Sequence, residues 1–315
     1  INIEDLSKKI DLSLEDSPTI KKEFADTLRK LILATPKSSS ALFFNQLFGG
    51  RNSKAVIGDL LAVLLNNSMA TYKISGPQVG VEKEILLQVK NLIGYKENYG
   101  GTFPTGGSMS NFMSLIIARD KKNLDIRNTG VNQKLIMYAS DNAHYSIAKN
   151  ASFSGIGRDN VRYIKSNSFG CLDVKLLEEA INIDLKKGYT PFYINATAGT
   201  TVLGAFDNIK GISKISKKHK LWLHVDGAWG GAVLFSKSYN KLIAGVENSD
   251  SFCFNAHKSL GVPLSSSVLL VADKKDLYNS FSNDASYLYQ THDNDYNLGQ
   301  TSFECGRRNN SLKLW

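Results

Sequence analysis

At residues 221–226 the chain reads Leu221-Trp222-Leu223-His224-Val225-Asp226, and Gly227-Ala228-Trp229-Gly230-Gly231 follows directly. An apolar run of this length is typical of a strand buried in a parallel sheet, so Asp226 is expected at the carboxyl end of that strand. A second run, Ser251-Phe252-Cys253-Phe254-Asn255, leads to Lys258 in the same way. Because ligands bind at this edge of open α/β sheets, Asp226 and Lys258 are expected to share a binding site.

A buried carboxylate and a nearby lysine are the pair of groups that pyridoxal phosphate chemistry requires. The lysine forms a Schiff base with the aldehyde, and the carboxylate keeps the pyridine nitrogen protonated, so that the ring accepts electrons. Each residue also has a plainer interpretation. Lys258 follows His257, and such a dipeptide is usually solvated surface; an aspartate at a strand end often only caps a helix. Other segments of the chain decide between these interpretations.

The order of predicted elements indicates an α/β fold. Helices are expected at 81–93 and 174–187, the second with Asp173 as its N-cap. Strands are expected near residues 134–140, 160–165, 191–197, 221–226, 251–255 and 267–272. This alternation predicts βαβ units around a mostly parallel central sheet flanked by helices, after a helix-rich start. A nicotinamide-binding Rossmann domain is the competing prediction, but Gly155-Ile156-Gly157 leads into a strand and does not open a helix.

Composition narrows the class of protein. The chain has 315 residues, 42% of them hydrophobic, which allows a large core. No apolar run approaches the roughly 20 residues of a membrane span, and residues 1–16 do not read as a signal peptide. The net charge of +9 comes from dispersed lysines, so neither nucleic acid nor a membrane is an expected partner. Cysteines 171, 253 and 305 have no disulfide or metal-ligand spacing, so we expect a cytoplasmic protein with no metal site.

Short motifs that bear chemistry occur in a fixed order along residues 39–315. They are Phe43-Phe44-Asn45-Gln46-Leu47, Gly106-Gly107-Ser108-Met109-Ser110-Asn111, His144-Tyr145-Ser146-Ile147, Asn195-Ala196-Thr197-Ala198-Gly199-Thr200-Thr201, His224-Val225-Asp226-Gly227-Ala228-Trp229-Gly230-Gly231, Asn255-Ala256-His257-Lys258 and Cys305-Gly306-Arg307-Arg308. In this order they resemble the group II pyridoxal-phosphate amino-acid decarboxylases, closest to the branch of glutamate decarboxylase and cysteine sulfinate decarboxylase. The resemblance implies an aspartate-aminotransferase-like (fold type I) large domain of the PLP-dependent transferases, with pyridoxal 5'-phosphate as cofactor.

For the cofactor phosphate, the resemblance implies Gly107 and Ser108. An independent reason supports them, because a glycine turn before a helix offers free N–H groups and a favourable dipole to an anion. Asn255 and His257, on either side of the lysine motif, would also approach the phosphate. The family usually has proline where this chain has Ala256, a change that removes no reacting atom.

For the pyridine ring, the resemblance implies a stacking histidine at His144, which would also assist proton transfer, since imidazole titrates near neutrality. Ala228 would lie under the opposite ring face, where a larger side chain would displace the ring. Thr201 would lie close to the ring and to Asp226, although a turn hydroxyl that caps local backbone is an equal alternative. Gly227 stands where alanine is commoner in the family.

The proton that returns to the substrate is assigned in the family to a tyrosine on a loop before the Cys-Gly-Arg motif. Tyr296 is the candidate by residue type, and an ungapped alignment would place His292 there instead. The catalytic residues implied by the resemblance are therefore Lys258, His144, Asp226 and Tyr296.

The implied reaction is a lyase reaction, the α-decarboxylation of a small acidic L-amino acid to an amine and carbon dioxide. Phe44 and Gln46 would contact the substrate, with the Gln46 amide on its distal acid group. An amide donor binds a carboxylate or a sulfinate, so glutamate, aspartate and cysteine sulfinate all remain open. Another fold type I enzyme, either an aromatic decarboxylase or an aminotransferase, and an inactive truncated homologue are the alternatives.

The resemblance also implies a domain organisation. Residues 1–70 would form a helical, dimer-forming segment, and residues 71–315 the cofactor-binding large domain, which we expect to be truncated. Family members continue into a small C-terminal domain that supplies an arginine for the substrate α-carboxylate, and no residue here is assigned to that role. The expected assembly is a homodimer with the active site at its interface.

Overall fold

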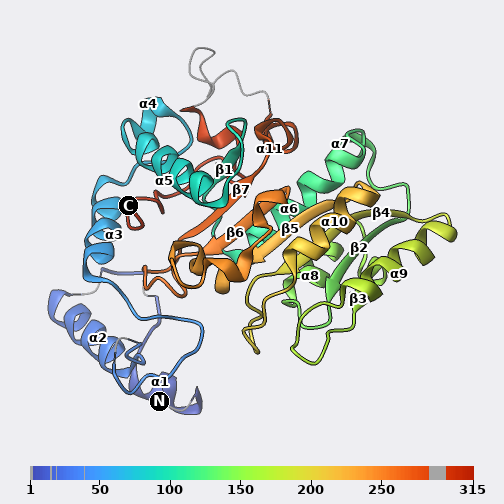
Figure 1. The fold of residues 1–315 in the computed structure, drawn as a ribbon. Coiled ribbons are helices and arrows are strands. Elements are labelled where there is room, and N and C mark those ends of the chain that lie inside the picture. The colour runs from blue at the N-terminus through green and yellow to red at the C-terminus, as the bar shows by residue number, and fades with distance from the viewer. Residues whose placement is uncertain (1–2, 15, 19, 39, 284–295) are drawn as a thin grey trace. The chain divides into compact units, whose positions relative to one another are not determined.

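The computed structural model describes residues 3–14, 16–18, 20–38, 40–283 and 296–315. The chain divides into two compact units, Ile1–Asn45 and Gln46–Trp315. The first contains α1 (Leu6–Lys9) and α2 (Lys21–Ala34), both labelled in Figure 1. None of the described side chains of α2 is buried. The domain boundary expected at residue 70 stays a prediction. Residues 46–70 belong to the second unit. In this segment the backbone N–H of Gly49 donates to the Lys258 carbonyl, and that of Asn52 donates to the Gly261 carbonyl.

One sheet of seven strands organises the second unit (Figure 1). Its strands are β1 (Gly100–Thr102), β2 (Leu135–Ser140), β3 (Val161–Ile164), β4 (Thr190–Thr197), β5 (Trp222–Gly227), β6 (Ser251–Asn255) and β7 (Ser267–Val271), in the spatial order β1-β7-β6-β5-β4-β2-β3. Strands β2 to β6 pair in parallel, whereas β7 is antiparallel to both β6 and β1. The predicted, mostly parallel sheet is confirmed. The antiparallel edge is an addition.

Helices cover both faces of the sheet. The α-helices described in this unit are α3 (Ser53–Leu65), α4 (Tyr72–Ser75), α5 (Gln78–Ile93), α6 (Gly107–Lys122), α7 (Ile126–Thr129), α8 (Ser146–Phe153), α9 (Val174–Lys186), α10 (Ile209–His219) and α11 (Lys274–Phe281). Apolar residues of α5, α9 and α10 share one core with the sheet, and those of α6, α7, α8 and α11 share the other. The Asp173 side chain caps α9 as predicted, accepting the backbone N–H groups of Lys175 and Leu176. None of the helices described is long and apolar enough to cross a membrane.

Strand β5 sends alternate side chains to these two cores. Leu223 and Val225 pack in the core of α5, α9 and α10, while Trp222 packs in the core of α6 and α8. His224 and Asp226 therefore face α6 together with Trp222. All five residues are at least 95% buried, so the row on the α6 side is a buried line of polar groups.

Candidate active site

A cavity of about 380 Å³ lies where the parallel strands end. Strand β4 contributes Thr197 and β5 contributes Asp226 to its wall. His144 follows β2, and Lys258 follows β6. The cavity thus lies at the carboxyl edge of the parallel sheet, as the sequence predicts for Asp226 and Lys258.

Most of the predicted site residues line this single cavity. They are Gly107, Ser108, His144, Thr201, Asp226, Ala228, Asn255 and Lys258. These residues span more than 150 positions of the sequence, and the sheet topology brings them together. Four further candidates, His257, Gln46, Phe44 and Tyr296, are not in the cavity wall.

The amino end of α6 forms one end of the cavity. The helix begins at Gly107, so the first N–H groups of its backbone have no partner within the helix. A Cβ on Gly107 would fall 2.7 Å from the Cβ of Ala228 and 3.1 Å from Asn255 Nδ2, so only glycine fits there. The Ser267 hydroxyl donates to Asn255 Oδ1 at 2.7 Å, which leaves the Nδ2 donor of Asn255 on the Gly107 side. Backbone and amide donors therefore converge at a site that suits an anion such as a phosphate.

Asp226 is held in one orientation by two groups. Its Oδ2 accepts a hydrogen bond from Asn111 Nδ2 at 2.7 Å, and its Oδ1 accepts the backbone N–H of Ala228 at 3.0 Å. The side chain is almost fully buried but still reaches the cavity. A buried carboxylate with these partners is suited to hold a cationic N–H group in the cavity.

His144 is half-buried beside Asp226 and Lys258. Burial lowers the pKa of its imidazole, the Asp226 carboxylate raises that pKa, and the Lys258 ammonium lowers it. Its Nδ1 lies 2.8 Å from the Ser146 hydroxyl and accepts the Ser146 backbone N–H at 3.2 Å. Because Nδ1 accepts a backbone N–H, the proton of the neutral ring is on Nε2.

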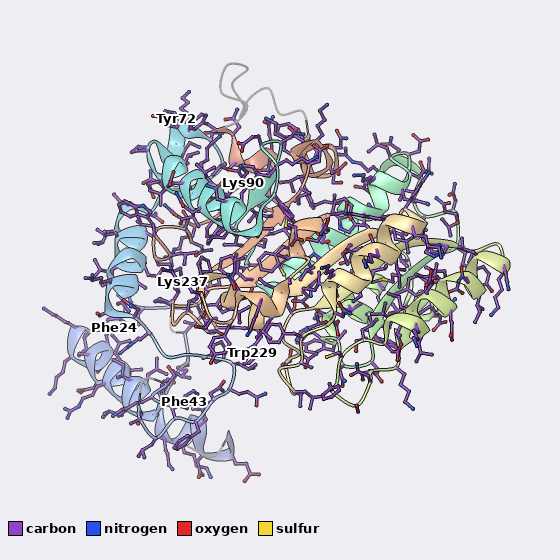
Figure 2. The ribbon with its side chains drawn as sticks, in the orientation of Figure 1. Phe24, Phe43, Tyr72, Lys90, Trp229 and Lys237 are labelled. Carbon is purple, nitrogen blue, oxygen red and sulfur yellow. The ribbon has the colours of Figure 1, made fainter. Side chains whose placement is uncertain are left out.

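Gln46 is hydrogen-bonded to two residues of the cavity wall, Thr201 and Trp229. Gln46 Nε2 donates to the Thr201 carbonyl at 2.8 Å. The indole N–H of Trp229, the residue labelled in Figure 2, donates to the Gln46 carbonyl at 2.9 Å. Gln46 therefore lies next to two residues of the cavity wall without lining it. Phe44, the other predicted substrate contact, belongs to the first unit and is 91% exposed.

His257 and Tyr296 lie outside the cavity wall. His257 Nδ1 accepts the backbone N–H of Ser266 at 3.0 Å. Tyr296 packs edge-on against Tyr72, with ring centroids 5.7 Å apart, and Lys83 Nζ lies 4.2 Å from the centre of its ring. His292, the alternative proton donor, falls outside the described residues. The roles of these residues stay predictions.

Sequence reasoning misses several cavity residues. They are Thr105, Gly106, Met109, Asn111, Tyr145, Thr197, Gly199 and Trp229. Asn111 is the most consequential, because it is 2% exposed and binds Asp226 directly. An asparagine on a helix that packs against the sheet needs hydrogen-bond partners, and that requirement is the signal that could have identified it.

Comparison with known proteins agrees with this geometry. Residues 4–315 match the pyridoxal-dependent decarboxylase conserved domain. The acidic amino acid decarboxylase GADL1 of Xenopus tropicalis is 37% identical over 318 residues, which cover 99% of this chain and 62% of that protein. The cysteine sulfinic acid decarboxylase of Homo sapiens is also 37% identical over 318 residues, which cover 99% of this chain and 64% of that protein. The chain thus spans just under two thirds of the length of these relatives.

Solved structures give the same result. The crystal structure of mouse CSAD superposes with a TM-score of 0.94 at 35% identity, covering 100% of this chain and 66% of that one. The crystal structure of Oryza sativa TDC with PLP and tryptamine superposes with a TM-score of 0.91 at 25% identity, covering 100% and 67%. The predicted fold type I architecture and the predicted resemblance are both confirmed. The chain belongs to the pyridoxal-dependent decarboxylase family.

Proposed function

We propose that this protein decarboxylates a small acidic L-amino acid, forming the corresponding amine and carbon dioxide with pyridoxal 5'-phosphate as cofactor. The observation that carries the proposal is the meeting of Asp226, Lys258 and His144 in one cavity at the amino end of α6. Family membership supports the chemistry, and the names of the two relatives, acidic amino acid decarboxylase and cysteine sulfinic acid decarboxylase, support the substrate class.

The residues present fit each part of the cofactor. The free N–H groups at Gly107 and Ser108, with the Asn255 amide, suit its phosphate. The buried Asp226 carboxylate suits its ring nitrogen, and the Lys258 amine suits its aldehyde. His144 and the small Ala228 suit the two faces of a flat ring. When bound, the cofactor supplies an electron-accepting ring for the bond that breaks at the α-carbon.

The protein's own groups have distinct tasks in this scheme. Asp226 holds a proton at the ring nitrogen, because a buried negative charge stabilises the protonated form. Lys258 would hold the cofactor through its amine, which suits the cofactor aldehyde. His144 carries its proton on Nε2, where it acts as a hydrogen-bond donor, because Nδ1 is occupied by Ser146. These residues orient the reacting groups and hold charge, which is the protein's share of cofactor catalysis.

We assign the binding of the substrate's distal acid group to Gln46, beside the cavity wall. Gln46 Nε2 already donates to Thr201, so a substrate acid would take over this donor or use its second hydrogen. Phe44 is proposed as a second substrate contact, and Tyr296 as the proton donor. Glutamate, aspartate and cysteine sulfinate remain equivalent on these grounds.

We also propose a cytoplasmic homodimer with the active site at its interface. Helix α3 supports the dimer, because Ile57, Leu60 and Leu64 expose 59%, 57% and 78% of their surfaces, an unusual apolar face for a monomer. None of the three cysteines forms a disulfide, which agrees with a reducing compartment. Sedimentation analysis should give twice the chain mass, and Leu64→Asp should lower it to one chain.

The activity is tested by carbon dioxide release from C1-labelled glutamate, aspartate and cysteine sulfinate, with dihydroxyphenylalanine as the aromatic comparison and pyridoxal phosphate added. Release from an acidic substrate, abolished in Lys258→Ala, is the expected result. Release from the aromatic substrate alone would reject the substrate class. Silence on all four substrates would reject the activity.

A further inference from the structure

Asn111 lies between the two residues that would contact the cofactor ring from different sides. It sits in the second turn of α6, is 2% exposed, and lines the cavity. Its amide contacts Asp226 on β5 and Ser146 at the start of α8. One side chain thus joins three elements beneath the cavity, and each contact has a defined donor and acceptor.

The direction of the bond to Asp226 fixes the Asn111 amide. A carboxylate offers only acceptors, so the Asn111 atom at 2.7 Å from Asp226 Oδ2 is the nitrogen. Asn111 Oδ1 then faces His224 Nε2 at 3.0 Å, and an oxygen at that place requires a proton on Nε2. Reversing the amide would bring Oδ1 against the carboxylate. The tautomer of His224 and the orientation of Asn111 therefore fix each other.

The far side of His224 completes this arrangement. Since Nε2 carries the proton, Nδ1 accepts from the Ser251 hydroxyl at 2.8 Å. The Ser251 oxygen in turn accepts the indole N–H of Trp222 at 3.0 Å. Burial lowers the pKa of His224 to about 4, so the ring stays neutral at physiological pH and keeps one donor and one acceptor. The hydrogen-bond chain has one consistent direction, from Trp222 to Asp226.

A second branch leaves the same amide. The other Asn111 Nδ2 hydrogen is directed to Ser146 Oγ at 3.2 Å, so the Ser146 hydroxyl proton is free to point to His144 Nδ1 at 2.8 Å. This bond, with the Ser146 backbone N–H, keeps the His144 proton on Nε2. Asn111 is thus connected to the residue expected at the ring nitrogen and, through Ser146, to the residue expected on the ring face.

We propose that Asn111 is a positioning residue that holds Asp226 and His144 together in the single hydrogen-bonding state that the cofactor ring requires, with His224 fixing the orientation of its amide. The proposal rests on the proposed function of this site. It extends that function by assigning the alignment of two proposed cofactor contacts, Asp226 and His144, to one residue of α6.

The decisive readout is cofactor binding in the absence of substrate. Asn111→Leu removes the donor to a buried carboxylate, and such a bond contributes about 1.5–3 kcal/mol, so the dissociation constant of pyridoxal phosphate should rise roughly 10- to 100-fold. The absorption spectrum of the bound cofactor should also change, because the protonation of its ring nitrogen depends on Asp226. Met113→Leu is the matched control, since Met113 is fully buried on the same helix and lies in the apolar core. Its affinity and spectrum should equal those of the wild type.

Asn111→Asp gives a signature that a merely structural role would not produce. The introduced carboxyl keeps the shape of the amide but donates to Asp226 only when protonated, because two carboxylates at this distance cannot both ionise. Cofactor affinity should be near that of the wild type at low pH and should fall as pH rises, by tenfold or more. The wild type measured at each pH corrects for the cofactor's own titration.

The surrounding ionisable groups do not produce the same profile. His224 on β5 stays neutral, and burial raises the pKa of the Cys253 thiol on β6, which lies 3.7 Å from Asn111 Oδ1. Tyr193 on β4 is stacked on His224, and burial raises the pKa of its phenol as well. His144 and Lys258 face Asp226 across the cavity in every variant, so their contribution cancels against the wild type.

Ser146→Ala provides a milder second variant in case Asn111→Leu does not fold. It removes the two neutral hydrogen bonds of the Ser146 hydroxyl, with Asn111 and His144, and keeps the bond from Asn111 to Asp226. Affinity should therefore fall only roughly 2- to 10-fold, with no new pH dependence. Wild-type affinity and spectrum in Asn111→Leu, or a wild-type pH profile in Asn111→Asp, would overturn the proposal. Wild-type protein that binds the cofactor but releases no carbon dioxide would overturn the proposed function alone, whereas wild-type protein that binds no cofactor would overturn both.

Discussion

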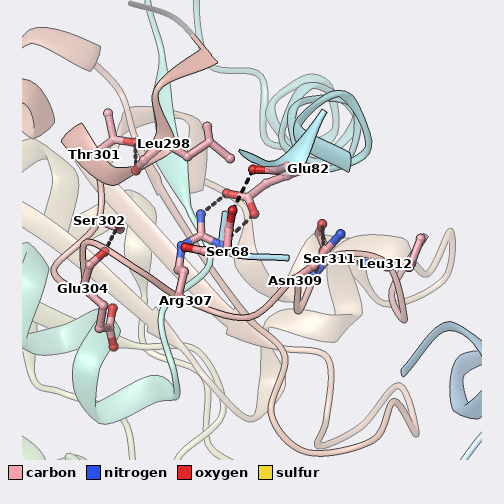
Figure 3. Close-up of polar contacts among 11 residues, drawn as sticks. Ser68, Glu82, Leu298, Thr301, Ser302, Glu304, Arg307, Asn309, Ser311 and Leu312 are labelled. Carbon is pink, nitrogen blue, oxygen red and sulfur yellow. Dashed lines mark hydrogen bonds and ion pairs between the residues drawn. The ribbon is translucent and has the colours of Figure 1, made fainter. Parts of the chain in front are cut away.

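The Arg307 guanidinium donates two hydrogen bonds to the Glu82 carboxylate, from Nη1 at 2.8 Å and from Nη2 at 2.5 Å (Figure 3). Glu82 lies on α5 and is fully buried, and Arg307 belongs to the Cys305–Arg308 motif and is 8% exposed. The Arg307 carbonyl also accepts the backbone N–H of Met69. This ion pair therefore links the C-terminal part of the described chain to α5, which packs on the sheet.

Breaking this pair should destabilise the fold strongly. Glu82→Gln leaves the guanidinium buried without its counter-charge, and removing one partner of a buried pair typically costs about 3–5 kcal/mol. We expect a loss of this size in the free energy of unfolding, measured by urea denaturation. Glu178→Gln is the control, because Glu178 pairs with Lys218 at the surface and should change stability little. Equal effects of the two substitutions would contradict the buried role.

The sequence predicts the sheet and the meeting of Asp226 with Lys258 because apolar runs indicate the strands that carry them. Asp226 ends an apolar run and Lys258 follows another, so the parallel topology alone brings them to one edge. Periodicity does not predict β1, because its segment Gly100–Thr102 is too short to show a strand pattern of apolar residues. Gly101 fits there because a Cβ would lie 2.8 Å from Leu86, a close approach that only the folded chain shows.

Asn111 illustrates the other limit. The motif around it is visible in the sequence, but its role depends on which face of α6 meets β5. Neighbouring helix positions Ser110 and Met113 are equally buried, so burial of α6 has no clean period. The hydrogen bonds to His224 and Asp226 arise from tertiary packing, which local sequence does not encode.

A methyl group at Gly107 should disturb the phosphate end of the cavity. Gly107→Ala places Cβ 2.7 Å from the Ala228 Cβ, and overpacking of this kind typically costs about 1–3 kcal/mol. We expect a matching loss of stability without cofactor, and weaker binding of pyridoxal phosphate. Gly106→Ala is the matched comparison, because its added Cβ meets nothing within 4 Å and its φ of 176° is extended backbone. Stability without cofactor should be unchanged there. A larger loss in Gly106→Ala would refute the packing argument.

Acid should destabilise the fold through His224. Burial lowers its pKa from 6.5 to about 4, so the unfolded chain binds a proton that the folded chain rejects. This contribution is absent above pH 6.5 and grows as pH falls towards 4, reaching about 3 kcal/mol at 1.36 kcal/mol per unit. Asp207 acts in the opposite direction, because burial raises its pKa to about 6 and acid then favours the folded state between pH 6 and 3.8.

The two effects are separated by comparing variants. Urea unfolding of the wild type and of His224→Gln, measured from pH 4.5 to 7.5, keeps the Asp207 contribution in both proteins. On acidification, the unfolding free energy of the variant should rise relative to that of the wild type by up to about 3 kcal/mol. A difference that does not depend on pH would mean that His224 is protonated in the folded state, and the proposed direction of the hydrogen bonds to Asn111 would fail with it.

Replacing the proposed proton donor should change the product and not only the rate. Tyr296 packs on Tyr72 and Lys83 outside the cavity wall, so its role requires that it reach the site in the assembled, substrate-bound protein. Tyr296→Phe keeps the ring contacts and removes the acid, and loss of a general acid typically lowers the rate 100-fold or more. We expect amine formation to fall by this factor while carbonyl products of abortive transamination rise, both measured by chromatography. His292→Ala is the parallel variant. Normal amine yield in Tyr296→Phe with carbonyl product in His292→Ala would transfer the role to His292.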